Sequence, residues 1–221
     1  LLLLAEGKRK DHFAAGFDMN YAWDFLEGIR NVFVKDSCVT TLLDIAHAEY
    51  DTIPVGKVKL RFITNHDEMV KMSPVKEFGG ERGAMAAFVL SSYLQGGALI
   101  YSSQEVAFPG CVDFFHYCHV DWNAKNEIRK EYEILMRLYN DYPAIRKGHL
   151  EVYPDCNIAA FQKELAQERF LVAVNVRNAA RTFLLPKEWA GHECIDACKD
   201  TLDVLPDTLC LAPYEYRILK Y

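Results

Sequence analysis

Apolar side chains recur with a helical period in four stretches of the chain, at residues 25–33, 39–50, 81–94 and 128–142. Short apolar runs with the character of strands lie before and between these stretches, at residues 1–5, 17–23, 58–62 and 98–101. Strands that alternate with helices form parallel sheets with helical crossovers. The pattern therefore predicts an α/β sheet or part of a barrel.

The pattern changes near His149. From there on, polar residues and Pro or Gly separate short β-rich runs at residues 158–161, 170–176, 182–185 and 214–219. Such a series of short strands is typical of an antiparallel domain. We therefore expect two domains, an α/β part over residues 1–148 and an antiparallel all-β part over residues 149–221.

The first residues, LLLLAEGKRK, lack the layout of a signal peptide, because no basic segment precedes the apolar run and charge follows it at once. Four large aliphatic residues followed by Ala5 instead predict a fully buried parallel strand. We therefore expect the chain to be a fragment of a longer protein. The sequence does not determine the compartment of the protein, and it favours the cytoplasm only slightly.

The charge balance bears on the partners of the chain. Its 25 Lys and Arg against 31 Asp and Glu give a net charge of −6, so no basic surplus exists to neutralise phosphates or anionic lipid. The longest strongly apolar runs are far shorter than the roughly 18 residues that cross a bilayer. We expect neither a nucleic-acid partner nor a membrane-spanning segment.

Seven cysteines, an odd number without a Cys-x-x-Cys pair, do not indicate a disulfide framework. Small buried thiols in a reducing compartment are the preferred interpretation. Cys194 and Cys198 with nearby His192 form the alternative, a metal site, although structural zinc usually takes tighter paired spacing. We expect neither a metal nor a cofactor in this chain.

Three carboxylates follow directly on predicted strands: Glu6, Asp67 and Glu105. In α/β barrels the loops after the strands converge on one face, which carries the active site. Two carboxyl groups on that face can serve glycoside hydrolysis, because its oxocarbenium-like transition state needs a proton donor and nearby negative charge. The alternative for each carboxylate is a solvated residue at a strand end without a function. For residues 65–67 the alternative is a polar turn, in which Asn and Asp bond to their own backbone.

Four segments resemble those of the α-amylase family of glycoside hydrolases. Residues 62–67 (FITNHD) resemble the F-x-x-N-H-D segment of barrel strand seven, and residues 3–6 (LLAE) the segment of strand five. Residues 16–25 (GFDMNYAWDF) are similar to strand six of amylases and neopullulanase-like enzymes, notably those of gut Bacteroides type. Residues 96–105 (GGALIYSSQE) resemble the strand-eight segment G-x-P-x-I-Y-x-G-x-E, with Gly97 and Ser103 in place of Pro and Gly.

The resemblance implies a role for each matching residue. Glu6 would be the general acid/base, and Asp67 would stabilise the transition state through hydrogen bonds with sugar hydroxyls. His66 would donate a hydrogen bond to the sugar at the cleavage point, and Asn65 would orient the turn. Tyr101 would bind substrate at the pocket floor, which Glu105 lines or braces.

The same resemblance implies the C-terminal half of a TIM (β/α)8 barrel, strands five to eight, followed by an antiparallel β-sandwich. The family nucleophile is an Asp at the end of strand four, ahead of Glu6, and this chain contains no such residue. Calcium would belong to the missing half. We expect an inactive chain that associates with that half or with itself as a homo-oligomer.

The implied substrate is an α-1,4-glucan or malto-oligosaccharide. Neopullulanase, cyclomaltodextrinase, α-glucosidase and branching-type transferase activities are open alternatives within the fold. The alternative from another functional class is a non-catalytic carbohydrate-binding or interaction module derived from such an enzyme.

Overall fold

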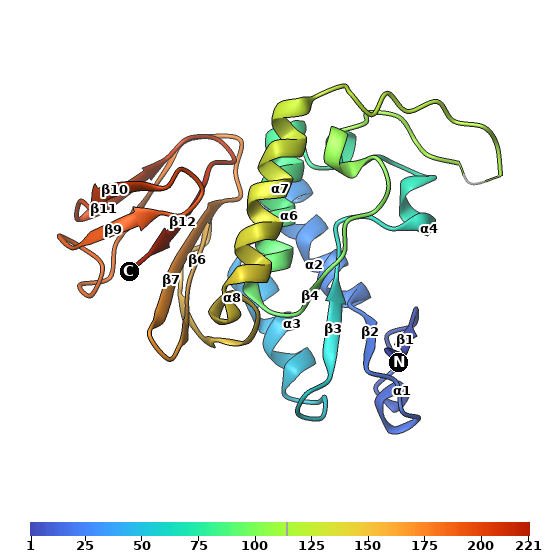
Figure 1. The fold of residues 1–221 in the computed structure, drawn as a ribbon, viewed down its shortest axis with the longest axis horizontal. Coiled ribbons are helices and arrows are strands. Elements are labelled where there is room, and N and C mark those ends of the chain that lie inside the picture. The colour runs from blue at the N-terminus through green and yellow to red at the C-terminus, as the bar shows by residue number, and fades with distance from the viewer. Residues whose placement is uncertain (114) are drawn as a thin grey trace.

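A computed structural model describes residues 1–113 and 115–221 of the chain. The first part holds four short parallel strands in the spatial order β1-β2-β3-β4. They are β1 (Leu4–Ala5), β2 (Met19–Tyr21), β3 (Val58–Arg61) and β4 (Gly97–Ala98). Helices and loops connect them, as Figure 1 shows. The predicted parallel α/β arrangement is confirmed.

The helices of this part occupy the stretches that the periodicity predicted. The longer ones are α2 (Trp23–Val34), α3 (Thr40–Tyr50), α6 (Glu81–Leu94) and α7 (Asn126–Asp141). The short ones are α1 (Asp11–Ala14), α4 (His66–Met69), α5 (Pro74–Glu77), α8 (Pro143–Lys147) and the 3₁₀ turn η1 (Gln104–Val106). Apolar on nearly all sides, α6 is buried from Gly83 to Leu94 and forms the centre of the molecule.

The expectation of a fully buried strand over residues 1–5 is wrong for this structure. Only Leu4–Ala5 form a strand, only Ala5 is buried, and Leu1 to Leu4 are at least 40% exposed. The physical reason is the strand order, because β1 lies at an edge of the parallel sheet and has a neighbour, β2, on one side alone.

The second part is antiparallel and begins at His149, as predicted. Its larger sheet has the order β10-β9-β12-β7-β6-β5 and its smaller sheet pairs β11 with β8. The strands are β5 (His149–Tyr153), β6 (Ile158–Leu165), β7 (Glu168–Asn175), β8 (Arg181–Leu184), β9 (Glu193–Asp196), β10 (Thr201–Val204), β11 (Thr208–Leu211) and β12 (Tyr216–Lys220). Apolar side chains from both sheets fill the space between them, together with Trp189 from the turn between β8 and β9.

One hydrophobic core joins the two parts. The large sheet turns its other face, with Phe161, Phe170 and Val172, toward helices α6 and α8. Figure 1 shows α6 and α7 between the parallel strands and the antiparallel sheet. The division into domains at residues 148 and 149 stays a prediction, because the fold type changes there while the core continues across it.

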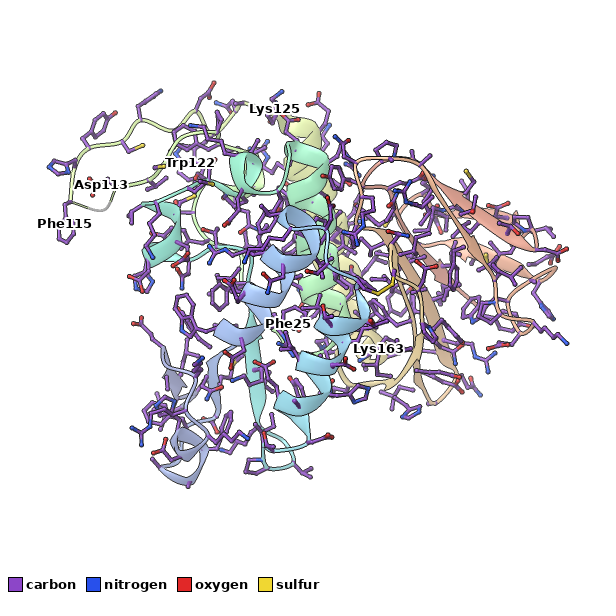
Figure 2. All side chains as sticks on the ribbon, turned by 180° about the vertical axis from the view of Figure 1, so that it is seen from behind. Phe25, Asp113, Phe115, Trp122, Lys125 and Lys163 are labelled. Carbon is purple, nitrogen blue, oxygen red and sulfur yellow. A yellow bond between two sulfur atoms is a disulfide. The ribbon has the colours of Figure 1, made fainter. Side chains whose placement is uncertain are left out.

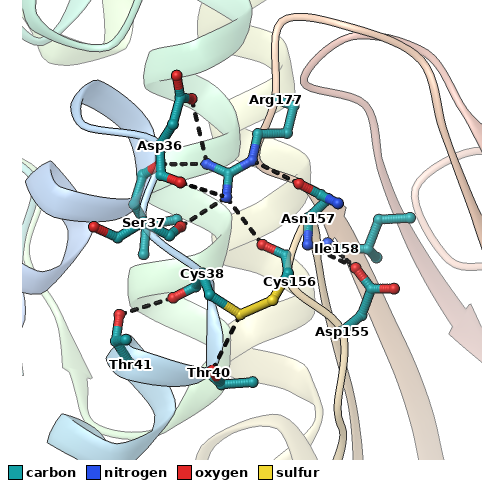
Figure 3. The surroundings of a disulfide bond; sticks show 11 residues. Asp36, Ser37, Cys38, Thr40, Thr41, Asp155, Cys156, Asn157, Ile158 and Arg177 are labelled. Atoms are coloured by element: carbon teal, nitrogen blue, oxygen red, sulfur yellow. Dashed lines mark hydrogen bonds and ion pairs between the residues drawn. A yellow bond between two sulfur atoms is a disulfide. The ribbon is translucent and has the colours of Figure 1, made fainter.

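A disulfide between Cys38 and Cys156 also joins the two parts, across 118 residues of sequence. Cys38 precedes α3 and Cys156 lies between β5 and β6. Figure 3 shows the bond and the residues around it. The expectation of free thiols is therefore wrong for this pair. The two cysteines meet only through tertiary packing, and no local spacing signals such a contact.

Arg177 completes this junction. Its guanidinium is buried and donates hydrogen bonds to the carbonyl oxygens of Val32 (2.5 Å), Ser37 (2.6 Å) and Cys156 (2.9 Å). Its Nε donates to Asn157 Oδ1 at 2.9 Å (Figure 3). One side chain thus holds the end of α2 and the loop before β6, on both sides of the disulfide.

Cys194 and Cys198 do not form a site with each other. Cys194 packs between the two antiparallel sheets, whereas Cys198 packs against the core on the other face. Burial raises the pKa of Cys194 to about 11 and that of Cys198 to about 12, so both remain thiols at neutral pH. Among residues 1–113 and 115–221, no group of three His, Cys, Asp or Glu side chains has the geometry of a metal site.

A lysine is buried at the contact between α6 and the large sheet. Lys163 on β6 is 1% exposed and its Nζ donates a hydrogen bond to the carbonyl oxygen of Leu94, the last residue of α6, at 3.2 Å. Burial lowers the pKa of Lys163 from 10.5 to about 8. Protonation of Lys163 is therefore less favourable in the folded state than in the unfolded state.

We expect Lys163→Met to raise the free energy of unfolding at pH 7 by about 2 kcal/mol, because it removes a buried charge while losing one hydrogen bond. Between pH 8 and 10.5 the unfolded chain binds more protons than the folded chain, so the wild type gains stability as the pH rises. The advantage of the variant therefore shrinks over this range. Urea denaturation of the wild type and the variant at pH 7 and pH 10 measures the difference between their free energies of unfolding. The same difference at both pH values would contradict the prediction.

Candidate active site

The candidate site lies where β1 and β3 end. Glu6 follows β1 directly, and its side chain is 67% exposed. The main chain here is fixed by two contacts, one with α2 and one with β2. Trp23 Nε1 donates to the carbonyl oxygen of Glu6 at 2.7 Å, and the amide of Tyr21 donates to the carbonyl oxygen of Gly7 at 3.2 Å. The carboxylate is thus free to meet a ligand while its backbone is held.

The segment after β3 turns at once into the short helix α4. Asn65 caps this helix, because its Oδ1 accepts hydrogen bonds from the amides of Asp67 and Glu68, both at 3.0 Å. This cap sets the direction of the two side chains that open α4, His66 and Asp67. Asn65 thus shapes this turn by capping α4, and the role that the resemblance implies for it stays a prediction.

We expect Asn65→Ala to lower the free energy of unfolding by about 1 to 2 kcal/mol, because two backbone amides lose their shared acceptor in a buried position. Asn65→Ser, which keeps an oxygen at the cap, is the matched control and should lose less than half as much. Urea denaturation measures both variants. Equal losses from Ala and Ser would exclude capping as the role of Asn65.

A second set of contacts anchors α4 to the body of the protein. Glu68 is buried and accepts hydrogen bonds from Arg30 at 2.5 Å and from Lys71 at 2.7 Å. Arg30 also donates to Glu77 at 2.7 Å, so one guanidinium links α2, α4 and α5. Burial acts to raise the pKa of Glu68, but the hydrogen bonds from Lys71 and Arg30 outweigh it and lower this pKa. Glu68 therefore stays ionised and holds α4 in place.

The imidazole of His66 brings the two predicted carboxylates together. His66 Nε2 lies 3.8 Å from Glu6 Oε1 and 3.5 Å from Asp67 Oδ1. The two carboxylates come from strand ends that are about sixty residues apart in sequence. Both are more than half exposed, so a ligand can reach them from solvent. The structure thus brings Glu6, His66 and Asp67 together, while the role of each stays a prediction.

Three aromatic rings form the wall beside these groups. The Phe62 ring, just after β3, packs against Tyr21 at 5.1 Å and against Trp23 at 5.2 Å between ring centroids. Burial, together with the negative charges of Glu6 and Asp67, raises the pKa of the Tyr21 hydroxyl, so this group stays protonated near both carboxylates. We assigned no role to Tyr21 from the sequence. Its position at the end of β2, between the ends of β1 and β3, is the signal that identifies it.

The residues after β4 are less closely tied to this group. Tyr101 is half-buried, and within the described part of the chain its side chain makes no hydrogen bond or ion pair with Glu6, His66 or Asp67. Glu105 lies in η1, and one of its carboxylate oxygens is buried without a hydrogen-bond partner among the residues that the structure describes. Beside it Gln104 Nε2 donates to Tyr132 Oη at 3.0 Å, which fixes η1 against α7. The role of Tyr101 stays a prediction.

Among the residues that the structure describes, no helix has both the length and the apolarity needed to cross a bilayer.

No family model and no curated protein matches this sequence. Solved structures do match it. An α-amylase from Lactobacillus plantarum is 18% identical with a TM-score of 0.83, over 100% of this chain and 55% of that chain. An Anoxybacillus α-amylase is 17% identical with a TM-score of 0.81, over 99% of this chain and 52% of that one.

A cyclic α-maltosyl-(1→6)-maltose hydrolase from Arthrobacter globiformis, solved in complex with cyclic α-maltosyl-(1→6)-maltose, is also similar. It is 20% identical with a TM-score of 0.77, over 100% of this chain and 49% of that chain. The chain thus spans about half the length of the structures it matches, over their C-terminal portions. The resemblance to the α-amylase family is confirmed at the level of the fold.

Proposed function

We propose that this chain is the C-terminal portion of a retaining α-amylase-type glycoside hydrolase that acts on α-1,4-glucans or malto-oligosaccharides. The observation that carries the proposal is the meeting of Glu6, His66 and Asp67 at the end of a parallel sheet. The fold of the amylase structures adds support, because glycosidases of this kind share it. The structure of the whole protein would then comprise this chain and a preceding half barrel.

In this proposal β1 to β4 are barrel strands five to eight, residues 1–148 are the second half of the catalytic barrel, and residues 149–221 are the C-terminal β-sandwich. The four strands are parallel and follow one another in space as in sequence, as neighbouring strands of a barrel do. The match to about half of each amylase chain supports the proposal that this chain is one part of such an enzyme.

Glu6 is the proton donor in this mechanism. Its carboxyl group protonates the glycosidic oxygen as the bond to the leaving sugar breaks, and its carboxylate then takes a proton from the water that hydrolyses the glycosyl-enzyme intermediate. The nucleophile of that intermediate would be an Asp one strand ahead of Glu6, in the half that precedes this chain. The hydrogen bond from Trp23 to the carbonyl oxygen of Glu6 keeps the acid in position.

Asp67 and His66 bind the sugar at the cleavage point. The Asp67 carboxylate accepts hydrogen bonds from sugar hydroxyls, which strengthen as positive charge develops on the ring. His66 donates to a hydroxyl of the same sugar, and Tyr101 contributes a contact at the pocket floor. The protonated Tyr21 hydroxyl, whose pKa burial and the charges of Glu6 and Asp67 raise, is an additional hydrogen-bond donor within this wall.

The substrate class and the alternatives rest on the same likeness. The Arthrobacter structure holds a cyclic oligosaccharide of maltose units, which supports a malto-oligosaccharide substrate here. Neopullulanase, cyclomaltodextrinase, α-glucosidase and transferase activities use the same fold, and calcium would bind in the preceding half. Homo-oligomers are a further proposal. A non-catalytic carbohydrate-binding module is the second candidate, favoured by the open exposure of Glu6 and Asp67.

We expect the isolated 221-residue chain to release no reducing sugar from soluble starch, and a co-expressed N-terminal half with the nucleophile Asp to restore release. The reason is that no residue of this chain stands one strand ahead of Glu6, so the covalent intermediate cannot form on it. A dinitrosalicylate assay on both preparations, with light scattering for association, measures this.

Activity from the isolated chain would contradict the fragment proposal together with the assignment of roles. Binding of maltoheptaose by both preparations without release of reducing sugar from either would instead favour the non-catalytic module. A co-expressed half in which Asn replaces the nucleophile Asp is the matched control, because it should assemble equally well and remain inactive.

A further inference from the structure

The segment between η1 and α7 is a long excursion from the body of the protein. Figure 1 shows it extending away from the helices, and Figure 2 places Asp113, Phe115 and Trp122 along it. Of the described residues in this segment, none belongs to a helix or strand. It carries two cysteines, Cys111, which is exposed, and Cys118, which is partly exposed.

The start of this segment is tied to its surroundings by hydrogen bonds of its backbone. The amide of Val112 donates to the carbonyl oxygen of Met69, the last residue of α4, at 3.2 Å. Ser73 Oγ donates to the carbonyl oxygen of Pro109 at 3.0 Å. The position of Cys111 is therefore coupled to α4, the helix that opens with His66 and Asp67.

The chain returns to this point at Cys118. Cys118 Sγ lies 3.5 Å from the carbonyl oxygen of Cys111, so its thiol contacts the residue that holds the other thiol. The two residues are seven positions apart, and the turn between them contains no strand or helix whose hydrogen bonds would resist a small adjustment in the described residues. A disulfide needs Cα atoms within about 7 Å of each other. The contact of the Cys118 thiol with the Cys111 backbone shows that the two residues lie close together.

We propose that Cys111 and Cys118 form a second disulfide when the protein matures under oxidising conditions, closing the segment on itself beside α4. Two thiols lose two protons and two electrons, and a disulfide such as oxidised glutathione accepts them and leaves as two molecules of glutathione. The step passes through a mixed disulfide that the second cysteine then resolves.

Comparison with the other free thiols of the chain identifies Cys111 and Cys118 as the pair that oxidises most readily. The bond between Cys38 and Cys156 requires oxidising conditions, under which further accessible pairs also oxidise. Cys194 is buried and Cys198 is largely enclosed, and burial raises the pKa of each thiol, which slows attack on a disulfide. Cys210 is exposed, but it lies on β11 in the small antiparallel sheet, far along the fold from the segment (Figure 1).

Mass spectrometry of the full chain tests the proposal. The chain is incubated with oxidised glutathione, alkylated with iodoacetamide in denaturant without reduction, and digested with trypsin. No Lys or Arg lies between Arg82 and Lys125, so both cysteines fall in one peptide. We expect this peptide to be unalkylated and two hydrogen masses lighter than the dithiol, and chymotrypsin cleavage after Phe115 or Tyr117 to leave two fragments joined by the bond.

Three alkylated cysteines per chain are therefore expected, in place of the five cysteines of the chain that are free when this pair is reduced. Cys210→Ser, the matched control, should keep the joined fragments, whereas Cys111→Ser should leave Cys118 available to alkylation. Alkylation of both Cys111 and Cys118 in most wild-type molecules would overturn the proposal. A bond from either one to Cys210 would overturn it as well. None of these outcomes depends on glycosidase activity, so the proposed function is tested separately.

Discussion

Glu6→Gln in the longer protein that contains this chain is expected to lower kcat on maltotetraose by about 10³-fold, with KM changed little. The amide keeps the shape of the side chain but cannot deliver a proton, and general acid catalysis contributes roughly two to four orders of magnitude. Backbone contacts from Trp23 and Tyr21 hold this position independently of the carboxylate, so the variant should fold as the wild type does. Steady-state kinetics and circular dichroism measure the two effects.

A change of leaving group separates the acid role from a structural one. Aryl maltosides with good leaving groups need less help from a proton, so their bond cleavage should be impaired less by Glu6→Gln than that of maltotetraose. Glu127→Gln, at an exposed carboxylate in the first turn of α7, is the matched control and should leave both substrates unaffected. A kcat for Glu6→Gln within about tenfold of wild type would remove Glu6 from the acid role.

The second large effect is expected at the junction of the two parts. Replacing both Cys38 and Cys156 by Ser should lower the free energy of unfolding by about 4 to 5 kcal/mol, because the disulfide closes a loop over 118 residues and limits the entropy of the unfolded chain. Whole domains are stable by roughly 5 to 15 kcal/mol. The double variant should therefore lose a large share of its stability, which urea denaturation of the isolated chain measures.

Two further measurements define the cause of that loss. Cys210→Ser removes an exposed thiol outside the junction and should leave the urea midpoint unchanged. Treatment of the wild type with dithiothreitol should reproduce the loss without any substitution. The buried hydrogen bonds of Arg177 persist in both cases, so the two parts should remain in contact below the transition. An unchanged midpoint after verified loss of the bond would show that the junction does not depend on it.

The sequence by itself determined the features that depend on near neighbours along the chain. The apolar periodicity located α2, α3, α6 and α7, and the change of pattern at His149 located the start of the antiparallel strands. The cap of α4 is equally local, because Asn65 bonds to amides two and three residues ahead. Side-chain spacing and short-range hydrogen bonds decide such features, and both can be recognised in a single sequence.

Only the tertiary structure decided which distant residues meet. Glu6 reaches His66 because β2 lies between β1 and β3 and holds their ends at one edge, and Cys38 reaches Cys156 because α3 and the loop before β6 pack against the same core. Lys163 is buried for the same kind of reason, since the end of α6 lies over it. A periodic pattern specifies which face of an element is buried, whereas these contacts depend on which elements share that buried surface, and the order of strands and the packing of helices set that.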